Sequence, residues 1–304
     1  MKRISAPAGP AGAADEFPAV SALIVNYRAY AELDACLASL VRQRPLVEIV
    51  VVDQDSDALE RQLLEQRYPD VRWLPQTTNS GFSAGVNLAA RHASAPYLYL
   101  VNPDAIVDDG TPAAMAGYLA GQPGVAVVGS RVLDADGAIQ GSARRFPGVS
   151  TLAGGRRSLL TRLFPGNAFT RRNILSGSHV TAPIRVDWVS GASLMVRREA
   201  FALVGGMDER FFLYWEDADL CRRLAAHGLA TVYHPGVSVT HLVGRSSRNS
   251  PRAVIAFHRS AYRYFATHAR GPARLARPLA ALVLALRAGA ELAAGWLGRR
   301  RRRA

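Results

Sequence analysis

Unbroken apolar segments alternate with helix-patterned segments through the first half of the chain. Val20 to Tyr27, Val47 to Asp53 and Tyr97 to Asn102 have the continuous apolar content of strands that are buried on both faces. Between them, Ala31 to Gln43 carries leucines at helical spacing, and Ser80 to His92 continues as a helix after a glycine. This alternation predicts an α/β fold with a mostly parallel sheet and helices on both faces.

The remaining segments divide the chain into regions. Residues 1–18 are rich in Ala, Pro and Gly and lack the apolar core of a signal peptide, which predicts a disordered leader. Residues 19–269 are predicted to form one domain. Within it, 142–185 is rich in Gly, Arg, Ser and Pro and is expected to be a long mobile loop, either a lid or a plain insertion. Val186 to Val196 again has the pattern of a strand, with Gly191 at a point of close approach. Ala230 to Tyr233 and Val237 to His241 are predicted to be short strands.

Polar side chains stand at the ends of three predicted strands. Asn26 lies one residue before the first strand stops, and Asp53 and Asn102 close two others. Sheets of this kind bind ligands beyond the carboxyl ends of their strands, so these side chains indicate a site. The alternative is ordinary turn chemistry, since Asp and Asn favour turns.

An acidic cluster opens a late predicted helix. Asp217 lies on the same helical stripe as Leu220 and Leu224, so it is expected to face the protein. Asp219 is expected to face outward and to pair with Arg223. An inward carboxylate costs free energy unless something uses or pairs it, which suggests a functional acid. The alternative is an acid that only caps the helix.

The excess of positive charge is concentrated near the end of the chain. From residue 270 onward there are nine Arg and one Glu, which accounts for +8 of the net charge of +13. A basic tail of this kind binds nucleic acid, anionic lipid or nothing specific. The only two cysteines, Cys36 and Cys221, are far apart, which argues against a disulfide framework and favours a reducing compartment.

Residues 270–304 form a separate basic tail. Its apolar side chains recur every three or four residues and are followed by five consecutive arginines, Arg299 to Arg303. The pattern predicts an amphipathic helix on an anionic membrane surface. The alternatives are a spanning helix, which would bury Arg287 and Glu291, and a helix packed on the body of the protein. The apolar positions are Leu275, Leu279, Leu282, Leu286, Ala293 and Trp296.

An ordered set of short motifs between Val20 and Ser247 resembles the inverting glycosyltransferases of family 2, which have the GT-A fold. The resemblance is greatest to rhamnosyltransferase-type members. The matching segments are Val25-Asn26-Tyr27, Val51-Val52-Asp53, Asn79-Ser80-Gly81-Phe82-Ser83-Ala84-Gly85-Val86-Asn87, Asn102-Pro103-Asp104, Gly205-Gly206-Met207-Asp208-Glu209, Glu216-Asp217 and His241.

The resemblance implies a donor site for a nucleotide sugar. Asp104 would hold Mg²⁺ or Mn²⁺, which offsets the charge of the leaving diphosphate, and His241 would complete the metal site. Gln54 departs from the family, which usually has Asn after the acid equivalent to Asp53. The residues expected to contact the donor are Asn26, Tyr27, Asp53, Asn79, Gly81, Asn87, Asn102 and Asp104.

The resemblance also implies the chemistry. Asp217 would take the proton from an acceptor hydroxyl, with Glu216 orienting it or holding the acceptor. Trp188, Gly191 and Trp215 are the expected acceptor residues. One tryptophan would stack on a sugar face, but the favoured alternative is that either is simply part of the core.

The expected reaction is transfer of L-rhamnose from dTDP-L-rhamnose to a lipid-linked or polysaccharide acceptor by a cytoplasmic enzyme at the inner face of the cell membrane, without a nucleic-acid partner. The residues themselves leave two alternative functions open. A sugar-nucleotide nucleotidyltransferase would need a Gly-rich phosphate loop after the first strand, where this chain has Asn26 to Tyr30. A nucleic-acid-binding protein would explain the charge but not the acids.

Overall fold

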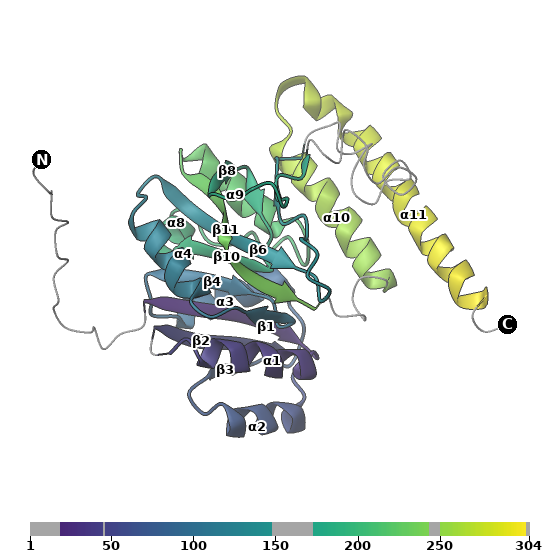
Figure 1. The fold of residues 1–304 in the computed structure, drawn as a ribbon. Coiled ribbons are helices and arrows are strands. Elements are labelled where there is room, and N and C mark those ends of the chain that lie inside the picture. The colour runs from purple at the N-terminus through teal and green to yellow at the C-terminus, as the bar shows by residue number, and fades with distance from the viewer. Residues whose placement is uncertain (1–18, 45, 148–172, 243–249, 302–304) are drawn as a thin grey trace, which may run out of the picture.

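The computed structural model describes residues 19–44, 46–147, 173–242 and 250–301 (Figure 1). The predicted disordered leader, most of the predicted mobile loop and the last arginines of the tail therefore lie outside the described residues. A nine-stranded sheet forms the centre, with the order β3-β2-β1-β4-β10-β6-β11-β5 and β8 paired to β11. Its strands are β1 (Val20–Tyr27), β2 (Val47–Gln54), β3 (Arg72–Pro75), β4 (Tyr97–Val101), β5 (Ala105–Val107), β6 (Val125–Leu133), β8 (Ile184–Val186), β10 (Ser193–Arg197) and β11 (Ala230–His241).

Most strands of the sheet point in one direction, as the sequence predicts. The pairs β2–β3, β1–β2, β1–β4 and β6–β11 are parallel. Strand β10 runs antiparallel between β4 and β6, and the short strands β5 and β8 run antiparallel to β11. The carboxyl ends of β1, β2, β4 and β11 therefore lie on one edge, where a ligand site of such a sheet is expected.

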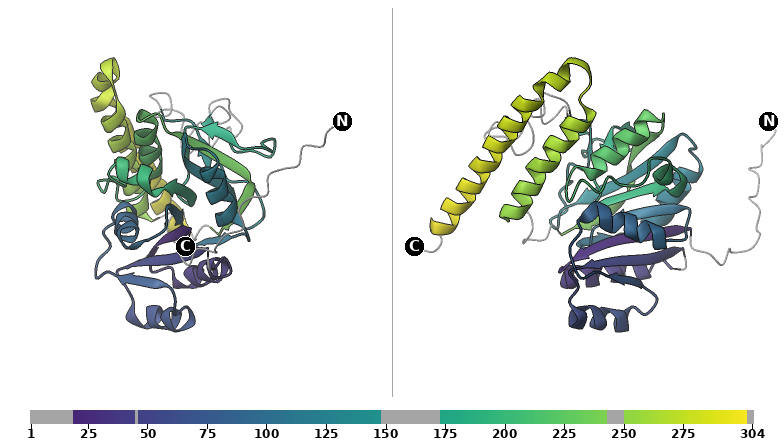
Figure 2. Two further views of the ribbon diagram at one scale, coloured as in Figure 1. Left: turned by 90° about the vertical axis from the view of Figure 1, so that its left-hand side faces the viewer. Right: turned by 180° about the vertical axis from the view of Figure 1, so that it is seen from behind.

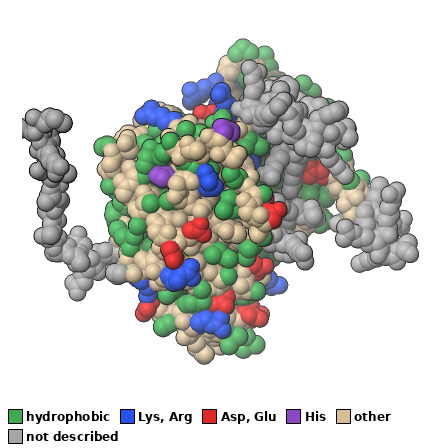
Figure 3. Space-filling view, viewed as in Figure 1, with side chains coloured by type: hydrophobic (Ala, Val, Ile, Leu, Met, Phe, Trp, Pro, Cys, Tyr) green, Lys and Arg blue, Asp and Glu red, His purple; other side chains and the backbone are tan. Residues whose placement is uncertain are grey.

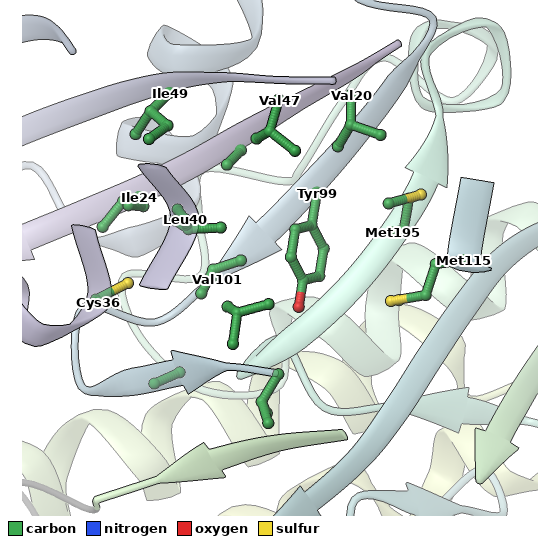
Figure 4. Close-up of a cluster of buried hydrophobic side chains, with 14 of the residues drawn as sticks. Val20, Ile24, Cys36, Leu40, Val47, Ile49, Tyr99, Val101, Met115 and Met195 are labelled. Carbon is green, nitrogen blue, oxygen red and sulfur yellow. The ribbon is translucent and has the colours of Figure 1, made fainter. Parts of the chain in front are cut away.

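Helices cover both faces of the sheet, and alternate strand residues separate two cores (Figures 1 and 2). On one face α1 (Tyr30–Val41) and α4 (Thr111–Ala120) pack on Val20, Ile24 and Tyr99, as Figure 4 shows. On the other face α3, α8 and α9 pack on Leu23, Val25 and Leu100. These helices are α3 (Phe82–His92), α8 (Arg198–Leu203) and α9 (Glu216–Ala226), and α2 (Ala58–Arg67) lies beside β3 at the sheet edge.

The prediction of one strand over Val186 to Val196 was wrong. The chain forms three short strands there, because its central part leaves the main sheet and pairs with β7 (Ala143–Arg144) through β9 (Trp188–Val189). The N–H of Asp187 donates to the carbonyl of Arg144, and that of Ser190 donates to the carbonyl of Ser142. A single β11 likewise replaces two predicted short strands, Ala230 to Tyr233 and Val237 to His241, with an irregularity between His234 and Ser238.

The two described ends of the predicted loop 142–185 are held in place, which corrects that prediction at its ends. Besides β7, an isolated bridge joins Arg144 to Ile174, and the N–H of Leu175 donates to the carbonyl of Ala143 over 2.8 Å. The side chain of Ser176 also accepts from the N–H of Ser142 over 3.1 Å. These backbone pairings need no apolar pattern, which explains why composition alone indicated a loop.

The C-terminal segment forms a helical hairpin on the side of the sheet toward which the parallel strands run (Figures 1 and 2). Helix α10 (Pro251–His268) is followed by a short 3-10 turn, Gly271–Ala276, and by α11 (Arg277–Arg301). Phe265 and Ala280 pack the two helices together. The predicted helix of the tail is therefore confirmed, and one of its faces packs on α10.

The opposite face of α11 is apolar and exposed. Leu279, Leu282 and Leu286 are 63%, 57% and 65% exposed, and Leu275 in the preceding 3-10 turn is 84% exposed. The stretch Gly271–Trp296 contains an 18-residue window with a mean hydropathy of 1.4 and is the one segment of the described chain long and apolar enough to cross a membrane. On the lower part of the body, acidic and basic side chains are interspersed (Figure 3).

Candidate active site

A strained turn delivers the acidic pair to the carboxyl edge of the sheet. Tyr214 and Trp215 both have left-handed backbone conformations, with φ of 69° and 73°, immediately before α9 starts at Glu216. Each such non-glycine residue costs about 1–3 kcal/mol, and strain of this kind accumulates at functional sites. Packing holds the turn: the Trp215 ring lies 5.4 Å from that of Tyr264 and 5.7 Å from that of Phe257.

Two consecutive residues, Gly191 and Ala192, connect Asp217 to the end of β4. Its Oδ2 accepts a hydrogen bond of 3.0 Å from the N–H of Gly191, and its Oδ1 accepts one of 2.8 Å from the N–H of Ala218. The next carbonyl, that of Ala192, accepts from the N–H of Asn102 over 3.2 Å. The half-buried acid of α9 and the polar end of β4 therefore occupy one region.

The two acids of the pair differ in environment. Glu216 is 6% exposed, and its Oε2 has no hydrogen-bond partner within the described part of the protein. Burial, reinforced by the charge of Asp217, raises the pKa of Glu216 well above its usual value. Burial also raises the pKa of Asp217, but the N–H groups of Gly191 and Ala218 and the charge of Arg144 oppose this shift. The pair thus favours a protonated Glu216 beside an ionised Asp217.

Asp219 does not face outward, which corrects the helical-wheel prediction. Its predicted pair with Arg223 is confirmed at 2.7 Å, yet Asp219 is completely buried. The reason is tertiary: α10 packs over this face of α9, and His268 Nε2 lies 2.7 Å from Asp219 Oδ1. Arg223 in α9 and His268 in α10 together satisfy the buried charge of Asp219.

Asp104 and His241 meet because β5 pairs with the end of β11. The register places His241 opposite Ala105, and the N–H of Leu242 donates to the carbonyl of Asp104 over 2.9 Å. His241 Nε2 then lies 3.0 Å from Asp104 Oδ1 and 3.2 Å from Asn102 Nδ2. The three residues that the sequence associates with the metal and the diphosphate are therefore neighbours.

The side chains of Asp104 and His241 supply only part of the ligand set that a divalent cation needs. A carboxylate and an imidazole suit Mn²⁺ better than Mg²⁺, whereas the carboxylate alone suits either. The described residues contain no group of three or more His, Cys, Asp or Glu side chains that could hold a metal ion. Asp104 and His241 would thus need ligands from elsewhere, and diphosphate oxygens are of the right chemical type.

Asn26 and Asp53 form a buried polar centre between the ends of β1 and β2. Both are completely buried, and Asn26 Nδ2 donates to Asp53 Oδ1 over 2.7 Å. The hydroxyls of Tyr30 and Ser56 donate to Asp53 Oδ2 over 3.0 and 2.5 Å. Next to this centre Tyr27 is 46% exposed and available for contact.

Two further left-handed residues mark the same strand ends. Arg28 and Asp55, directly after β1 and β2, have φ of 55° and 51° and form an ion pair of 2.8 Å. Sequence reasoning missed both, although each directly follows a buried strand. Their strained backbone places them beside the expected nucleotide position.

Gln54 explains how the chain accommodates its departure from the family motif. Its Oε1 accepts from the N–H groups of Ser80 and Gly81 over 2.5 and 3.2 Å, and its Nε2 donates to the carbonyl of Gly81 over 2.8 Å. Asn79 Oδ1 also accepts from the N–H of Gly81 over 2.9 Å. A longer amide side chain thus secures the turn that opens α3.

Gly81 has a specific steric role. Its φ is 94°, and a Cβ there would lie 2.6 Å from the carbonyl oxygen of Phe212. That carbonyl instead accepts from the N–H of Phe82 over 2.7 Å, and the hydroxyl of Ser83 donates to the carbonyl of Phe211 over 2.7 Å. The start of α3 is therefore locked to the segment that leads into the acidic pair.

Asn87 is engaged within the protein. Its Oδ1 accepts from the N–H of Met207, and its Nδ2 donates to the carbonyl of Met207 and to Glu209 Oε1, each over 2.9 Å. These contacts hold the Gly205-Gly206 turn, whose second glycine would otherwise place a Cβ 2.6 Å from Asn87 Oδ1. The sequence predicts that Asn87 contacts the nucleotide-sugar donor. The hydrogen bonds within the protein leave few polar atoms of this side chain free for that contact.

The aromatic residues expected at the acceptor side lie around the acidic pair. Trp188 Nε1 donates to the carbonyl of Arg145 over 2.9 Å, and the guanidinium of Arg144 lies 5.1 Å from its ring centroid. Trp188 and Trp215 both pack on the cluster of Phe211 and Tyr264, so each has a role in packing. Arg144 was missed by sequence reasoning because it lies in the segment interpreted as a loop.

Gly191 contributes to the site through its backbone N–H. A Cβ there would lie 3.8 Å from Asp217 Cβ, which is ordinary contact, so close steric approach is not the reason for a glycine. This corrects the expectation that the residue marks a tight approach. Its N–H instead holds Asp217.

A mostly parallel sheet with its polar edge facing an acidic helix is the architecture of a nucleotide-sugar-dependent glycosyltransferase. The chain belongs to the family described as glycosyltransferase like family 2, which matches residues 18–260. It is accordingly an enzyme that transfers a sugar, which favours this reading over nucleotidyl transfer or nucleic-acid binding.

Individual comparisons agree with this assignment. Over 274 residues the chain is 34% identical to the N-acetylglucosaminyl-diphospho-decaprenol L-rhamnosyltransferase of Mycobacterium tuberculosis, covering 84% of this chain and 86% of the relative. The mannosyltransferase PcManGT from Pyrobaculum calidifontis, solved with GDP-Man and Mn²⁺, has a TM-score of 0.57 at 18% identity over 93% of this chain and 81% of its own. GalNAc-T7, solved with UDP, GalNAc and Mn²⁺, has a TM-score of 0.58 at 14% identity over 83% of this chain and 51% of its own. These two structures support the GT-A fold.

Proposed function

We propose that this enzyme transfers L-rhamnose from dTDP-L-rhamnose, with inversion, to a hydroxyl of a lipid-linked saccharide. The single observation that carries the mechanism is the position of Asp217, held by Gly191 beside the end of β4. The choice of donor and acceptor is supported by the relative from Mycobacterium tuberculosis, whose printed name states an L-rhamnosyl transfer onto a diphospho-decaprenol saccharide.

Asp217 acts as the general base. It accepts the proton of the acceptor hydroxyl while that oxygen attacks the anomeric carbon and the bond to the nucleoside diphosphate breaks. Its two N–H donors hold the carboxylate in one orientation, and the charge of Arg144 favours the ionised form. The raised pKa of Asp217 makes it a stronger base than an exposed aspartate.

Glu216 acts as a neutral hydrogen-bond donor beside the base. Its burial and the neighbouring charge of Asp217 favour the protonated carboxyl. A protonated carboxyl donates one hydrogen bond, and its unpartnered Oε2 is available to a hydroxyl of the acceptor. Of the two roles expected from sequence, orienting the base or holding the acceptor, we propose the second for Glu216.

The donor occupies the edge formed by the ends of β1, β2 and β4. Asn26, Tyr27 and Asp53 lie on the base and ribose side, and Asn102 and Asp104 on the diphosphate side, where Asn79 and Gly81 begin α3. Backbone N–H groups at a helix start favour a phosphate. A divalent cation, Mg²⁺ or Mn²⁺, held by Asp104 and His241 would offset the charge of the leaving diphosphate.

Trp188 and Trp215 border the acceptor, and Gly191 supplies the N–H that keeps the base in position. Both tryptophans retain their packing contacts, so each would contact a sugar with only part of its ring.

The outer face of α11 lies on the cytoplasmic surface of the membrane. Its three exposed leucines and Leu275 in the turn before it would enter the interfacial region, and the arginines of the tail would meet anionic lipid headgroups. Glu291 lies toward α10, where its Oε1 is 3.8 Å from His258 Nε2, which supports a surface helix over a spanning one.

The reaction is tested with purified full-length protein, dTDP-L-rhamnose and a polyprenyl-diphosphate N-acetylglucosamine acceptor. We expect a rhamnosylated lipid with inverted anomeric configuration, dependent on Mg²⁺ or Mn²⁺. Release of product from UDP or GDP sugars but not from dTDP-L-rhamnose would remove the assignment of the donor while leaving the enzyme class intact.

Membrane attachment is tested by sedimentation with phosphatidylglycerol vesicles. Leu279→Asp together with Leu286→Asp should release the protein, whereas Leu59→Asp on α2, at a position 75% exposed, should not. Equal sedimentation of all three proteins would contradict a role for the leucine face.

A further inference from the structure

A cationic cavity lies between α10, the start of α11 and the segment before the acidic pair. It has a volume of about 580 Å³ and is lined by Arg210, Arg259, Tyr262, Arg263, Ala266, Thr267 and Arg277. Four of these seven residues are arginines, and two others carry hydroxyls. A set of guanidinium groups around a hollow is the donor arrangement that binds phosphate and diphosphate.

The positive charge of this cavity is only partly compensated. Arg210 pairs with Asp208 over 2.6 Å, with the carboxylate 16% exposed. Arg263 donates to the carbonyl of Arg210, and Arg277 Nη2 donates to the carbonyl of Ala266 over 2.5 Å. Carbonyl partners hold these two guanidinium groups in place and leave their positive charges unneutralised.

One atom of the cavity lining lacks a partner. Arg277 Nε is buried and has no hydrogen-bond acceptor among the residues that the structure describes. A buried guanidinium donor without an acceptor costs free energy, which an anionic ligand would recover. Arg277 also begins α11, so a ligand at this place would contact both helices of the hairpin.

The cavity and the acidic pair lie at two ends of one short segment. Arg210 stands six residues before Glu216, and Ser260 of α10 donates to the carbonyl of Leu213 over 2.9 Å within that interval. The expected donor diphosphate lies elsewhere, at Asp104 and the start of α3. The cavity is therefore lined by none of the residues expected to hold the donor.

We propose that this cavity binds the diphosphate of a lipid-linked acceptor, an inference that rests on the proposed function. Arg259, Arg263 and Arg277 supply the charge that a diphosphate ester needs, and the hairpin that carries these three exposes leucines on its outer face for the lipid. The acceptor sugar would extend from the diphosphate toward Glu216 and Asp217. The same phosphate chemistry occurs in a phospholipid headgroup, and the test separates the two sources.

The direct test measures farnesyl diphosphate binding to the full chain by calorimetry, without a sugar donor. Arg259 is exposed and its side chain makes no hydrogen bond to another residue that the structure describes, so it is the residue to change. We expect Arg259→Gln to weaken binding about tenfold and Arg259→Glu to weaken it further. The matched control is Arg252→Gln, an exposed arginine on the same helix outside the cavity, which should leave binding unchanged.

Two results would overturn the proposal. Equal losses in the Arg252 and Arg259 variants would mean general attraction to a basic surface. If Arg259→Gln leaves farnesyl diphosphate binding unchanged but weakens sedimentation on phosphatidylglycerol vesicles, the cavity binds phospholipid headgroups instead.

Kinetics separate this inference from the proposed function. With an active enzyme, Arg259→Gln should raise the KM for the lipid-linked acceptor and leave the KM for the donor and kcat unchanged. An unchanged acceptor KM would remove the cavity assignment alone. Absence of rhamnosyl transfer by the wild-type protein, together with Arg259-dependent binding of farnesyl diphosphate, would instead remove the proposed reaction and leave a diphosphate site.

Discussion

The backbone N–H of Gly191 donates a hydrogen bond of 3.0 Å to Oδ2 of Asp217, joining the turn before β10 to the first turn of α9. Residues 26 positions apart thereby become one unit. The adjacent carbonyl of Ala192 accepts from Asn102, which extends the connection to the end of β4. The acid of a late helix is thus positioned by the antiparallel strand inserted into the sheet.

Asp217→Asn should reduce kcat by about 10²–10⁴-fold, because the amide cannot accept the proton of the acceptor hydroxyl. The shape of the side chain is kept, so donor binding measured by calorimetry should stay unchanged. Asp109→Asn, at an exposed carboxylate that contacts Arg42 and Gln43, serves as the control with full activity. Full turnover in the Asp217 variant would exclude this residue as the base.

Glu216→Gln should raise the melting temperature at neutral and alkaline pH. The pKa of Glu216 is raised in the folded state, so its contribution to stability is complete below the unfolded pKa of about 4.3 and is lost as the pH rises through the folded pKa. The amide mimics the protonated carboxyl and avoids that loss. Melting curves from pH 4 to pH 9 should therefore converge at the acidic end, and a variant that is less stable throughout would contradict a neutral Glu216.

Asp104→Ala and His241→Ala should each weaken donor binding in the presence of Mg²⁺ or Mn²⁺, because the two side chains meet at 3.0 Å. In excess chelator, the wild type and both variants should bind the donor equally weakly. We expect non-additive losses in the double variant, since residues in contact couple. Equal losses with and without the cation would indicate a structural pair instead.

Asn87→Ala should destabilise the protein by about 1–3 kcal/mol, because the N–H and carbonyl of Met207 lose their partner. Urea unfolding measures this cost. The Kd for the nucleotide-sugar donor should change little at a temperature where the variant is folded. A large loss of donor affinity with unaltered stability would instead support the donor contact expected from sequence.

Gly85→Ala and Gly191→Ala should have different effects on stability. Alanine normally stabilises a helix interior by about 1 kcal/mol relative to glycine, yet a Cβ at Gly85 would lie 2.7 Å from Val25 Cγ1. At Gly191 the nearest atoms are 3.8 Å away, and the N–H is retained. We expect Gly85→Ala to lower the melting temperature. Gly191→Ala should leave the melting temperature unchanged and retain full activity.

The alternation of buried strands and helices was readable from sequence because each element satisfies a local rule. The limits of β1 over Val20–Tyr27 agree with the prediction, since a strand buried on both faces has no polar interruption. The short strands β7 and β9 escaped prediction because two-residue pairings depend on a distant partner. Asp219 was misplaced for a related reason, since the helical wheel of α9 does not include α10.

The site residues were predicted as a set, and the structure brings several together. Asn102, Asp104 and His241 are neighbours, as are Asn26 and Asp53. The contributions of Arg144, Gln54 and the Arg28–Asp55 pair were missed, because none follows a pattern that periodicity detects. Left-handed backbone at Tyr214 and Trp215 was equally invisible, since neither residue type favours it.

By itself the sequence determined the class of fold, the strand ends that carry polar groups and the amphipathic pattern of the tail. These follow from hydrophobic periodicity, which acts over a few residues. Tertiary structure decided which acid is exposed, which arginines surround a cavity and which face of α11 remains uncovered. Burial and charge compensation depend on elements far apart in the chain, so they exist only after those elements have packed.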